Sequence, residues 1–286
     1  MYRATRAKEG MTEFSAQPLL VTATASVWDV VCRGACKHRS DEECTNATHL
    51  VFPYRGVYVH HVGRGETVAE ANQVIFINGG ETYQVSHPVA GGDASLSLTV
   101  SEPMLQELAP KQYLGGKQPI AFNRSRLRID PRAQALVALL RHSLSRGTIE
   151  TLEAETLTLT LVRRALGERT SHTASASFGR QKLVDRAKLV LSSDPARRWT
   201  LGEIAAQVGV SAVYLTQLFQ QVEGVPLYRY QLRLRLARAL DLLGQYDDLT
   251  MLGLDLGFSS HSHFSAAFRQ AYGRSPAEFQ RSAHLR

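Results

Sequence analysis

Three cysteines lie within 13 residues in the stretch CRGACKHRSDEEC, which begins at residue 32. Their spacing is Cys-x3-Cys-x7-Cys. Other metal-ligand residues stand close by: His38, Glu42, Glu43 and His49. Three thiolates with an imidazole or a carboxylate can hold zinc in a tetrahedron, and thiolates also bind copper(I). Cys32, Cys36 and Cys44 are therefore a candidate site for zinc or another thiol-bound metal ion, the one cofactor that the sequence suggests.

Two other interpretations of these cysteines stay open. Basic residues beside the thiols favour the thiolate form, so the cluster would instead sense oxidants. Alternatively, Cys32 ends an expected strand, where a small apolar thiol can be purely structural. The spacing matches no standard zinc signature, and an odd cysteine count without a secretion signal argues against a disulfide framework.

Seven short segments between Leu19 and Glu102 are rich in Val, Ile, Thr and Tyr, as strands are. They are LLVTAT, VWDVVC, HLVF, GVYVHHV, QVIFIN, YQVS and SLSLTV, and glycine-containing turns separate them. This spacing predicts a small β-barrel or sandwich. The mouth of such a barrel can hold one small ligand, for which Tyr58, Phe76 and Tyr83 are the candidate lining residues.

Helical periodicity replaces the strand pattern after Asp130. PRAQALVALLRHSLSRG begins with Pro131 in its first turn and ends at Gly147. The next segment, TLEAETLTLTLVRRALG, carries a broad apolar stripe, which predicts either packing on the barrel or a dimer seam. ERTSHTASASFG, at 168–179, is small and polar, as linkers are.

The charge of the chain is uneven. Its 286 residues carry a net +7, divided as −2 in residues 1–100, +4 in 101–177 and +5 in 178–286. A basic excess in the last segment is expected of a surface that contacts phosphates. No apolar run approaches the ~18 residues of a membrane span, and the opening MYRATRAKEGMTEF lacks the apolar core of a secretion signal. We therefore expect a cytoplasmic protein without membrane contact.

The stretch LGEIAAQVGVSAVYLTQLFQQ, at 201–221, predicts two helices joined by a tight turn. Two apolar sets have the three-and-four spacing of a helix face: Leu201, Ile204, Ala205 and Val208, then Leu215, Leu218 and Phe219. Between them, Gly209 can adopt a left-handed conformation and Ser211 can cap the second helix. This is a helix-turn-helix pattern.

The same pattern occurs a second time at 252–276. Gly257 and Ser259 follow Gly209 and Ser211 by 48 residues. With one inserted residue, three further positions match: Leu215 with Phe264, Phe219 with Phe268, and Gly224 with Gly273. A long helix from about Pro226 to Leu243 is expected to join the copies. Two linked copies are far more specific than one, since a plain helical hairpin resembles a single motif.

The segments EIAAQVGVSAVYLTQLF, YRYQLRLRLARALDLL and LGFSSHSHFSAAFRQAYGRSPAEF resemble the AraC/XylS family of bacterial transcription regulators over residues 178–286. HLVFPYRG and FINGGETYQVSHP look, more loosely, like the cupin-type sensor barrel of many members. The resemblance implies sequence-specific DNA binding with two recognition helices in successive major-groove segments. Two departures are Gly253, where alanine is usual, and Ala266, where many members have arginine; the second puts base contact there in doubt.

The recognition helices are expected at Ser211 to about Val222 and at Ser260 to Ala271. Their outward residues are the candidate DNA contacts: Ala212, Val213, Thr216, Gln217, Gln220, His261, Ser262, Ser265, Ala266 and Arg269. Gln217 suits adenine, the Val213 and Thr216 methyls suit the thymine methyl, and Arg269 suits a phosphate. Three linker arginines point at varied angles, so only some reach DNA, and the others pair with acids or solvent: Arg229, Arg233 and Arg235.

These patterns predict an α+β protein in which a cupin-like barrel and a helical connector precede an all-α domain with two helix-turn-helix motifs. The expected parts are a flexible tail at 1–15, the sensor barrel at 16–110, the helical connector or dimerisation segment at 111–167, the linker at 168–179 and the DNA-binding domain at 180–286. The expected partners are double-stranded DNA, a second copy in a homodimer, an ionic or small-molecule effector and, for an activator, RNA polymerase.

No pattern typical of catalysis is present, so we expect no enzyme. Cupin enzymes bind metal through an HxH pair, whereas His60 and His61 are adjacent and point to opposite faces of a strand. Alkylation-repair regulators hold zinc with Cys-x3-Cys and Cys-x2-Cys pairs, and this chain has the first pair only. A thiol repair enzyme fused to a DNA-binding domain is thus the alternative from another class. Within the regulator interpretation, the signal is a thiol-bound metal or oxidant, or alternatively an organic effector in the barrel.

Overall fold

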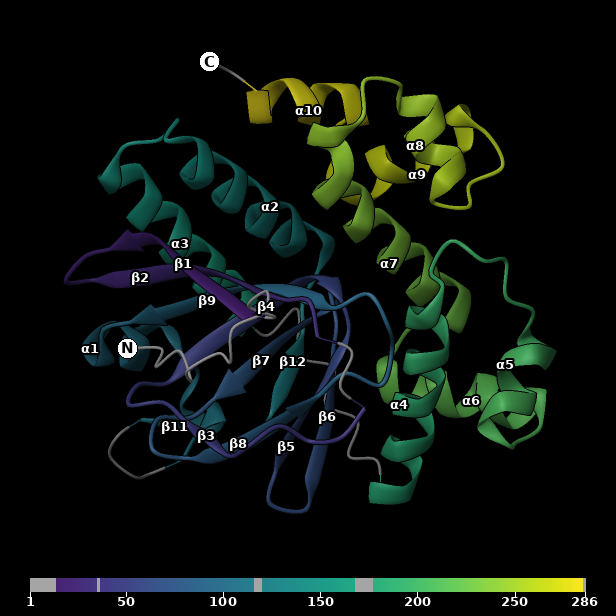
Figure 1. Cartoon of the computed structure of the whole chain (residues 1–286), viewed down its shortest axis with the longest axis horizontal. Coiled ribbons are helices and arrows are strands. Elements are labelled where there is room, and N and C mark those ends of the chain that lie inside the picture. The colour runs from purple at the N-terminus through teal and green to yellow at the C-terminus, as the bar shows by residue number, and fades with distance from the viewer. Residues whose placement is uncertain (1–13, 35–36, 116–119, 168–176, 285–286) are drawn as a thin grey trace, which may run out of the picture. The chain divides into compact units, whose positions relative to one another are not determined.

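The computed structural model in Figure 1 divides the chain into two compact units, Met1–Ser171 and His172–Arg286. The structure describes residues 14–34, 37–115, 120–167 and 177–284. Most of the expected flexible tail and most of the expected linker lie outside the described residues, and Phe14 and Ser15, which were expected to end the tail, begin strand β1 (Phe14–Val21) instead. In the described ranges, no helix combines the length and the apolar character needed to cross a bilayer.

Antiparallel sheets dominate the first unit. A six-stranded sheet has the order β1-β2-β9-β4-β7-β12, and a four-stranded sheet has the order β3-β8-β5-β6. The strands of the first are Phe14–Val21, Ala25–Cys32, Asp93–Val100, His49–Gly56, Gln73–Ile77 and Arg126–Arg128. Those of the second are Glu43–Cys44, Thr82–Ser86, Tyr58–Val62 and Gly65–Ala69. A short pair, β10 (Leu114–Gly115) and β11 (Ala121–Phe122), completes the set.

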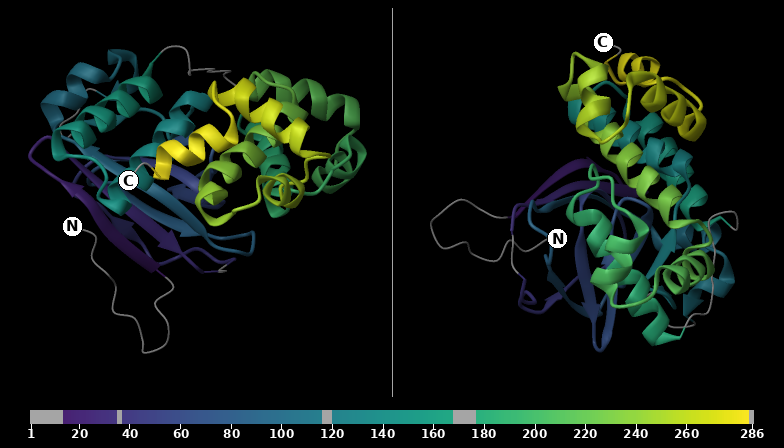
Figure 2. Two further views of the ribbon diagram at one scale, coloured as in Figure 1. Left: turned by 90° about the horizontal axis from the view of Figure 1, so that it is seen from above. Right: turned by 90° about the vertical axis from the view of Figure 1, so that its right-hand side faces the viewer.

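Period-2 alternation gives the six-stranded sheet two buried faces. Leu50, Phe52 and Phe76 belong to one apolar core together with helical residues, whereas Val51 and Ile75 belong to a second core together with residues of the four-stranded sheet. The result is three layers, with helices on one face and the smaller sheet on the other (Figures 1 and 2). Hydrogen bonding among the described strands keeps the two sheets separate, so the expected closed barrel is not shown.

The helices of the first unit are α1 (Glu102–Leu108), α2 (Pro131–Arg146) and α3 (Thr151–Leu166), with a 3-10 turn, η1, at Lys111–Tyr113. Asp130 begins α2 by accepting a hydrogen bond from the Ala133 N–H, and Gly147 ends it at φ 63°. The stripe on α3 is buried in the core that α2 and the large sheet share, which confirms packing for that stripe. Leu152 alone of the stripe is strongly exposed, at 74%.

The expected helical connector at 111–167 begins later than predicted. Residues before Pro131 form η1 and three short strands, and β12 extends the six-stranded sheet by pairing with β7. Leu127 in β12 is buried in the main core, which explains why this segment belongs to the sheet rather than to a helical layer.

The second unit is helical throughout its described elements. Its helices are α4 (Phe178–Ser193), α5 (Leu201–Val208), α6 (Ala212–Glu223), α7 (Leu227–Leu242), α8 (Leu249–Asp255), α9 (His261–Tyr272) and α10 (Pro276–His284), with a 3-10 turn, η3, at Leu243–Gln245. Helix α7 runs between two groups of helices, α4–α6 at one end and α8–α10 at the other (Figure 2).

Candidate nucleic-acid interface

The first helix-turn-helix motif is formed by α5 and α6. Gly209 ends α5 at φ 80°, and the Ser211 side chain accepts a hydrogen bond from the Tyr214 N–H at the start of α6. Leu215 and Phe219 are fully buried beneath α6. The glycine and serine inside the apolar periodicity therefore make the turn that the sequence predicted.

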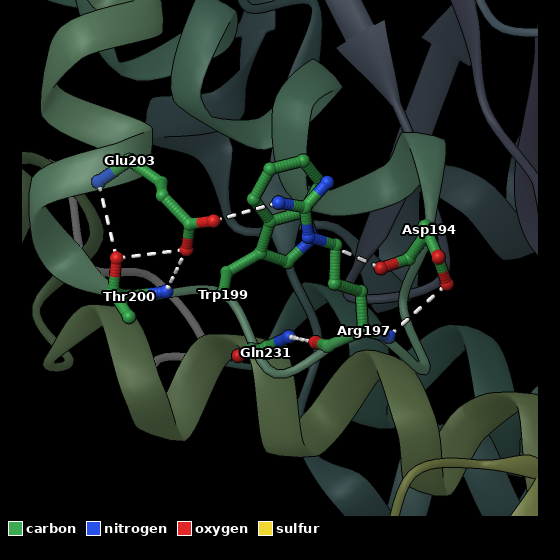
Figure 3. Close-up of polar contacts among 6 residues, drawn as sticks. All are labelled: Asp194, Arg197, Trp199, Thr200, Glu203 and Gln231. Atoms are coloured by element: carbon green, nitrogen blue, oxygen red, sulfur yellow. Dashed lines mark hydrogen bonds and ion pairs between the residues drawn. The ribbon is translucent and has the colours of Figure 1, made fainter.

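The loop that enters this motif is fixed by polar contacts (Figure 3). Thr200 and Glu203 form a capping box at the start of α5. The hydrogen bonds from Thr200, and then the Arg197 guanidinium at 2.6 Å, lower the pKa of the Glu203 carboxyl to about 2. Arg197 also stacks over the Trp199 ring at 4.0 Å, and Gln231 of α7 donates to the Arg197 carbonyl at 2.7 Å. The motif is thus held in a defined orientation on α7.

The second motif is formed by α8 and α9, and its cap corrects the sequence alignment. Ser260, not Ser259, accepts the capping hydrogen bond from the His263 N–H. Ser259 lies instead 3.1 Å from His263 Nδ1 through its hydroxyl. The inserted residue therefore lies inside the turn, and α9 follows α6 by 49 residues along its whole length. Both helices have 12 residues and end at a left-handed glycine, Gly224 or Gly273.

Most of the ten candidate contacts face solvent. On α6, Val213 is 70% exposed, and Thr216, Gln217 and Gln220 are exposed. Ala212 departs from the expectation because it packs partly against the core. Tyr214, which is not among the ten predicted contacts, is 41% exposed on the same helix. Its aromatic ring at an apolar-looking position concealed its exposure in the sequence pattern.

On α9, His261, Ser262, Ala266 and Arg269 are exposed, and Ser265 is half-buried. The Ser265 hydroxyl lies 3.2 Å from His261 Nε2. Arg269 lies 3.7 Å from the Glu278 carboxylate of α10. That exposed pair contributes little to stability and leaves the guanidinium accessible to a phosphate. A hollow of about 530 Å³ beside it is lined by Arg269, Gly273, Arg274 and Glu278.

Arg235 of α7 joins the two motifs. Its guanidinium donates to the main-chain carbonyls of Pro195, Ala196 and Arg197, before the first motif, and to that of Gly257, in the turn of the second. This replaces the expected pairing with an acid or with solvent. Gly257 also lies so close to Ala196 that a β-carbon there would fall 1.9 Å from its carbonyl oxygen.

Arg229 and Arg233 are the other two predicted linker arginines, and both lie on α7. Arg229 is exposed and donates to the Tyr228 hydroxyl, whereas Arg233 is half-buried.

Gly253 packs against Phe264. A β-carbon at 253 would lie 3.1–3.3 Å from the ring and from the β-carbon of Phe264. An alanine at 253 would require the Phe264 side chain to shift by a few tenths of an ångström, so glycine is the residue that fits beside this ring.

The candidate residues of the first unit are not brought together as predicted. Cys44 pairs with Thr82 at the start of β8, whereas Cys32 lies close to His87, which follows the end of β8. About five residues of extended chain separate those two ends, roughly 16 Å. Cys44 is therefore not a neighbour of Cys32, and Cys36 lies outside the described residues.

The three aromatic residues expected to line a ligand cavity are also divided between two cores. Tyr58 and Tyr83 belong to the core between the two sheets. Phe76 faces the helical layer and stacks on Phe122, with ring centroids 3.9 Å apart. Strand alternation places Phe76 on the opposite face from its neighbours Ile75 and Ile77, so it does not share a cavity with the tyrosines.

The first unit should lose stability when the pH falls from about 6.5 to 4. Burial lowers the pKa of His49 and of His60 to about 4, and the neighbouring His61 contributes to the shift at His60. At these two histidines the unfolded chain therefore binds up to two more protons than the folded chain in this window, so their contribution to the free energy of unfolding falls as the pH falls. Urea unfolding at several pH values, for the wild type and His60→Gln, measures the slope. The variant should have a shallower slope, and equal slopes would contradict the prediction.

Comparison with known proteins agrees with the paired motifs. Residues 204–282 match the helix-turn-helix domain family model. Over 239 residues the chain is 27% identical to the probable transcriptional regulator LumQ of Photobacterium leiognathi, covering 82% of this chain and 92% of that protein. A putative AraC-like transcription regulator of Streptomyces lividans is 26% identical over 197 residues, which are 67% of this chain and 62% of the relative.

A crystal structure of a transcriptional regulator with an AraC-type DNA-binding domain, from Chromobacterium violaceum, is 33% identical over 37% of this chain and 96% of that one, with a TM-score of 0.35. The paired motifs and the sequence matches define a DNA-binding transcription regulator. Its C-terminal unit is a helix-turn-helix domain of the AraC type.

Proposed function

We propose that α6 and α9 read two successive major-groove segments on one face of an operator. The observation that carries this proposal is the repeat of one capped 12-residue helix, with buried core residues and an exposed polar face, at both ends of α7. A recognition helix needs this combination, because the core side fixes its position and the outer side meets base edges.

The length of α7 fits this arrangement with a modest adjustment. Its 16 residues span about 24 Å at 1.5 Å per residue, against ~34 Å between successive major-groove segments. Recognition helices displaced outward from the ends of α7 reduce the difference. Bending of the DNA, at roughly 1–6 kcal/mol, supplies the remainder.

Footprinting on the region upstream of its own gene tests this proposal. We expect retardation in a gel shift at low salt and, in the footprint, two protected groove segments per subunit on one face of the duplex. Protection of one segment per subunit would contradict the proposed reading by both motifs. Absence of retardation at low salt, with or without added effectors, would contradict the regulator itself.

Substitutions on the two recognition helices should have different effects on binding. Gln217→Ala should weaken specific binding by about 1–3 kcal/mol and relax the preference at one base pair, because a bidentate contact to adenine would be lost. Arg269→Ala should weaken binding to all sequences and reduce the salt slope by about one, because it removes a phosphate contact. Fluorescence anisotropy on specific and random duplexes over a range of salt concentrations measures both quantities.

Gln245→Ala and Arg281→Ala are matched controls, because these exposed residues lie outside α6 and α9. Both should bind as the wild type does. Equal losses on specific and random DNA for Gln217→Ala and Arg269→Ala would show that the assignment of helix faces is wrong.

We also propose that the first unit senses the signal and that the regulator acts in the cytoplasm as a homodimer, with RNA polymerase as a partner if it activates. A thiol-bound ion or an oxidant acting at Cys32 is the favoured signal. The alternative is an organic effector near Tyr58 and Tyr83, which share one apolar core beside the buried His60. The thiol repair enzyme is not favoured, since the matched relatives bear the names of transcription regulators.

A further inference from the structure

Three metal-ligating side chains of different chemistry meet at one end of the first unit. Cys32 is the last residue of β2, Asp93 is the first residue of β9, and His87 directly follows β8. Their ligand atoms all lie within 4.8 Å of one another. His87 and Asp93 are 8% and 7% exposed, and Cys32 is half-buried. This Cys32–His87–Asp93 cluster thus draws on both sheets.

The backbone holds this cluster firmly. Cys32 and Asp93 are direct partners in the β2–β9 register, so their side chains share one face of the sheet. At Gly92, φ is +67° and a β-carbon would lie 2.2 Å from the Cys32 carbonyl oxygen. At Gly56, φ is +68° and a β-carbon would lie 2.0 Å from the Gly92 carbonyl oxygen. The ends of β2, β4 and β9 therefore approach each other more closely than any residue other than glycine would allow at positions 56 and 92.

We propose that Cys32, His87 and Asp93 bind one Zn²⁺ ion, or a similar divalent transition-metal ion. One thiolate, one imidazole and one carboxylate form a ligand set that suits Zn²⁺, which takes sulfur, nitrogen and oxygen donors in a tetrahedron. The fourth position is left to water. The ion replaces the thiol proton of Cys32 and the proton shared by His87 Nε2 and the Asp93 carboxylate, which are 2.6 Å apart, and both protons leave to solvent.

This site differs from the three-cysteine site that the sequence suggested. Cys44 is exposed on β3 and lies opposite Thr82, at the far end of β8 from His87. The distinguishing ligands are therefore His87 and Asp93, more than fifty residues away from Cys32 in sequence. The inference rests on the proposed function only in identifying the ion as the signal, since the site stands on its own geometry.

Cobalt substitution of the full chain tests the site. After treatment with a chelator, Co²⁺ should bind at one ion per chain, with tetrahedral visible bands and a thiolate charge-transfer band in the near ultraviolet. Zn²⁺ should displace it. Cys32→Ser should abolish the charge-transfer band, and His87→Gln and Asp93→Asn should each weaken Co²⁺ binding more than about tenfold. Cys44→Ser, the matched control, should bind as the wild type does.

Two results would overturn the site. One is no bound ion in the folded wild type, which leaves His87 and Asp93 as an ion pair only. The other is a spectrum that survives His87→Gln and Asp93→Asn but is lost in Cys44→Ser. Circular dichroism identifies any variant that fails to fold. The test then relies on Cys32→Ser, which alters the side chain least. Gel shifts with and without Zn²⁺ form a separate readout. DNA binding that Zn²⁺ does not alter would reject the ion as a signal, and absence of DNA binding would reject the proposed function. In either case the Co²⁺ spectrum decides whether the metal site exists.

Discussion

Gly257→Ala should destabilise the C-terminal unit far more than Gly209→Ala, although the two glycines have nearly the same conformation. Their φ angles are +81° and +80°, so each alanine bears the strain of a left-handed residue, about 1–2 kcal/mol. A β-carbon at 209 meets nothing within 4 Å, whereas one at 257 falls 1.9 Å from the carbonyl oxygen of Ala196. Because backbone atoms yield less readily than a flexible side chain, Gly257→Ala should cost about 1–3 kcal/mol more, or prevent folding.

Guanidinium unfolding of the full chain, followed by the fluorescence of Trp199 in a Trp28→Phe background, measures this difference. Trp199 lies in the loop that contacts Gly257 through Ala196, so it reports on the region in question. Gly209→Ala controls for the left-handed conformation alone. Equal losses in the two variants would mean that the second motif does not depend on its contact with this loop.

The second large effect is expected at Lys188, which is fully buried in α4. Its ammonium lies 2.5 Å from the Glu223 carboxylate of α6 and 3.7 Å from that of Asp185, and it approaches the Tyr230 ring of α7 at 5.5 Å. Lys188→Met fills most of the same volume but leaves two buried carboxylates without this cation. We expect the free energy of unfolding to fall by about 3–5 kcal/mol.

Adding Glu223→Gln to Lys188→Met should restore part of the loss, because it removes one of the buried charges. Lys182→Met, at an exposed position of the same helix, should change the stability by less than about 0.5 kcal/mol. The same denaturation experiment serves for all three variants. A loss below about 1 kcal/mol in Lys188→Met would show that water enters and solvates the carboxylates.

Local patterns were sufficient to predict the C-terminal unit. Glycine at 209 and serine at 211 have direct backbone consequences, and apolar spacing defines the faces of α6 and α9. The exception was the counterpart of Ser211, because the run Phe258-Ser259-Ser260 offers two serines and only the turn geometry selects Ser260 as the cap. The burial of Lys188 was not predicted, because an amphipathic pattern gives no reason to bury a lysine.

The N-terminal unit was harder to predict, since strand patterns identify segments but not their partners. All seven expected strands are present, yet the alternation within β7 placed Phe76 and the two tyrosines in different cores. The cysteines show the same limit. Closeness in sequence suggested that Cys32 and Cys44 share a site, whereas the sheet pairing separates them and brings His87 and Asp93 to Cys32 instead.

Arg235 has a consequence for how such a regulator can change over generations. All four of its hydrogen bonds go to main-chain carbonyls, so its hold on both motifs is independent of the side chains in the loop and the turn. The outer faces of α6 and α9 can therefore exchange residues freely while the separation between the helices stays constant. Under the proposed function, the base sequence of an operator can change, and substitutions on α6 and α9 can restore its recognition. An operator whose half-site spacing changes is no longer bound by this regulator.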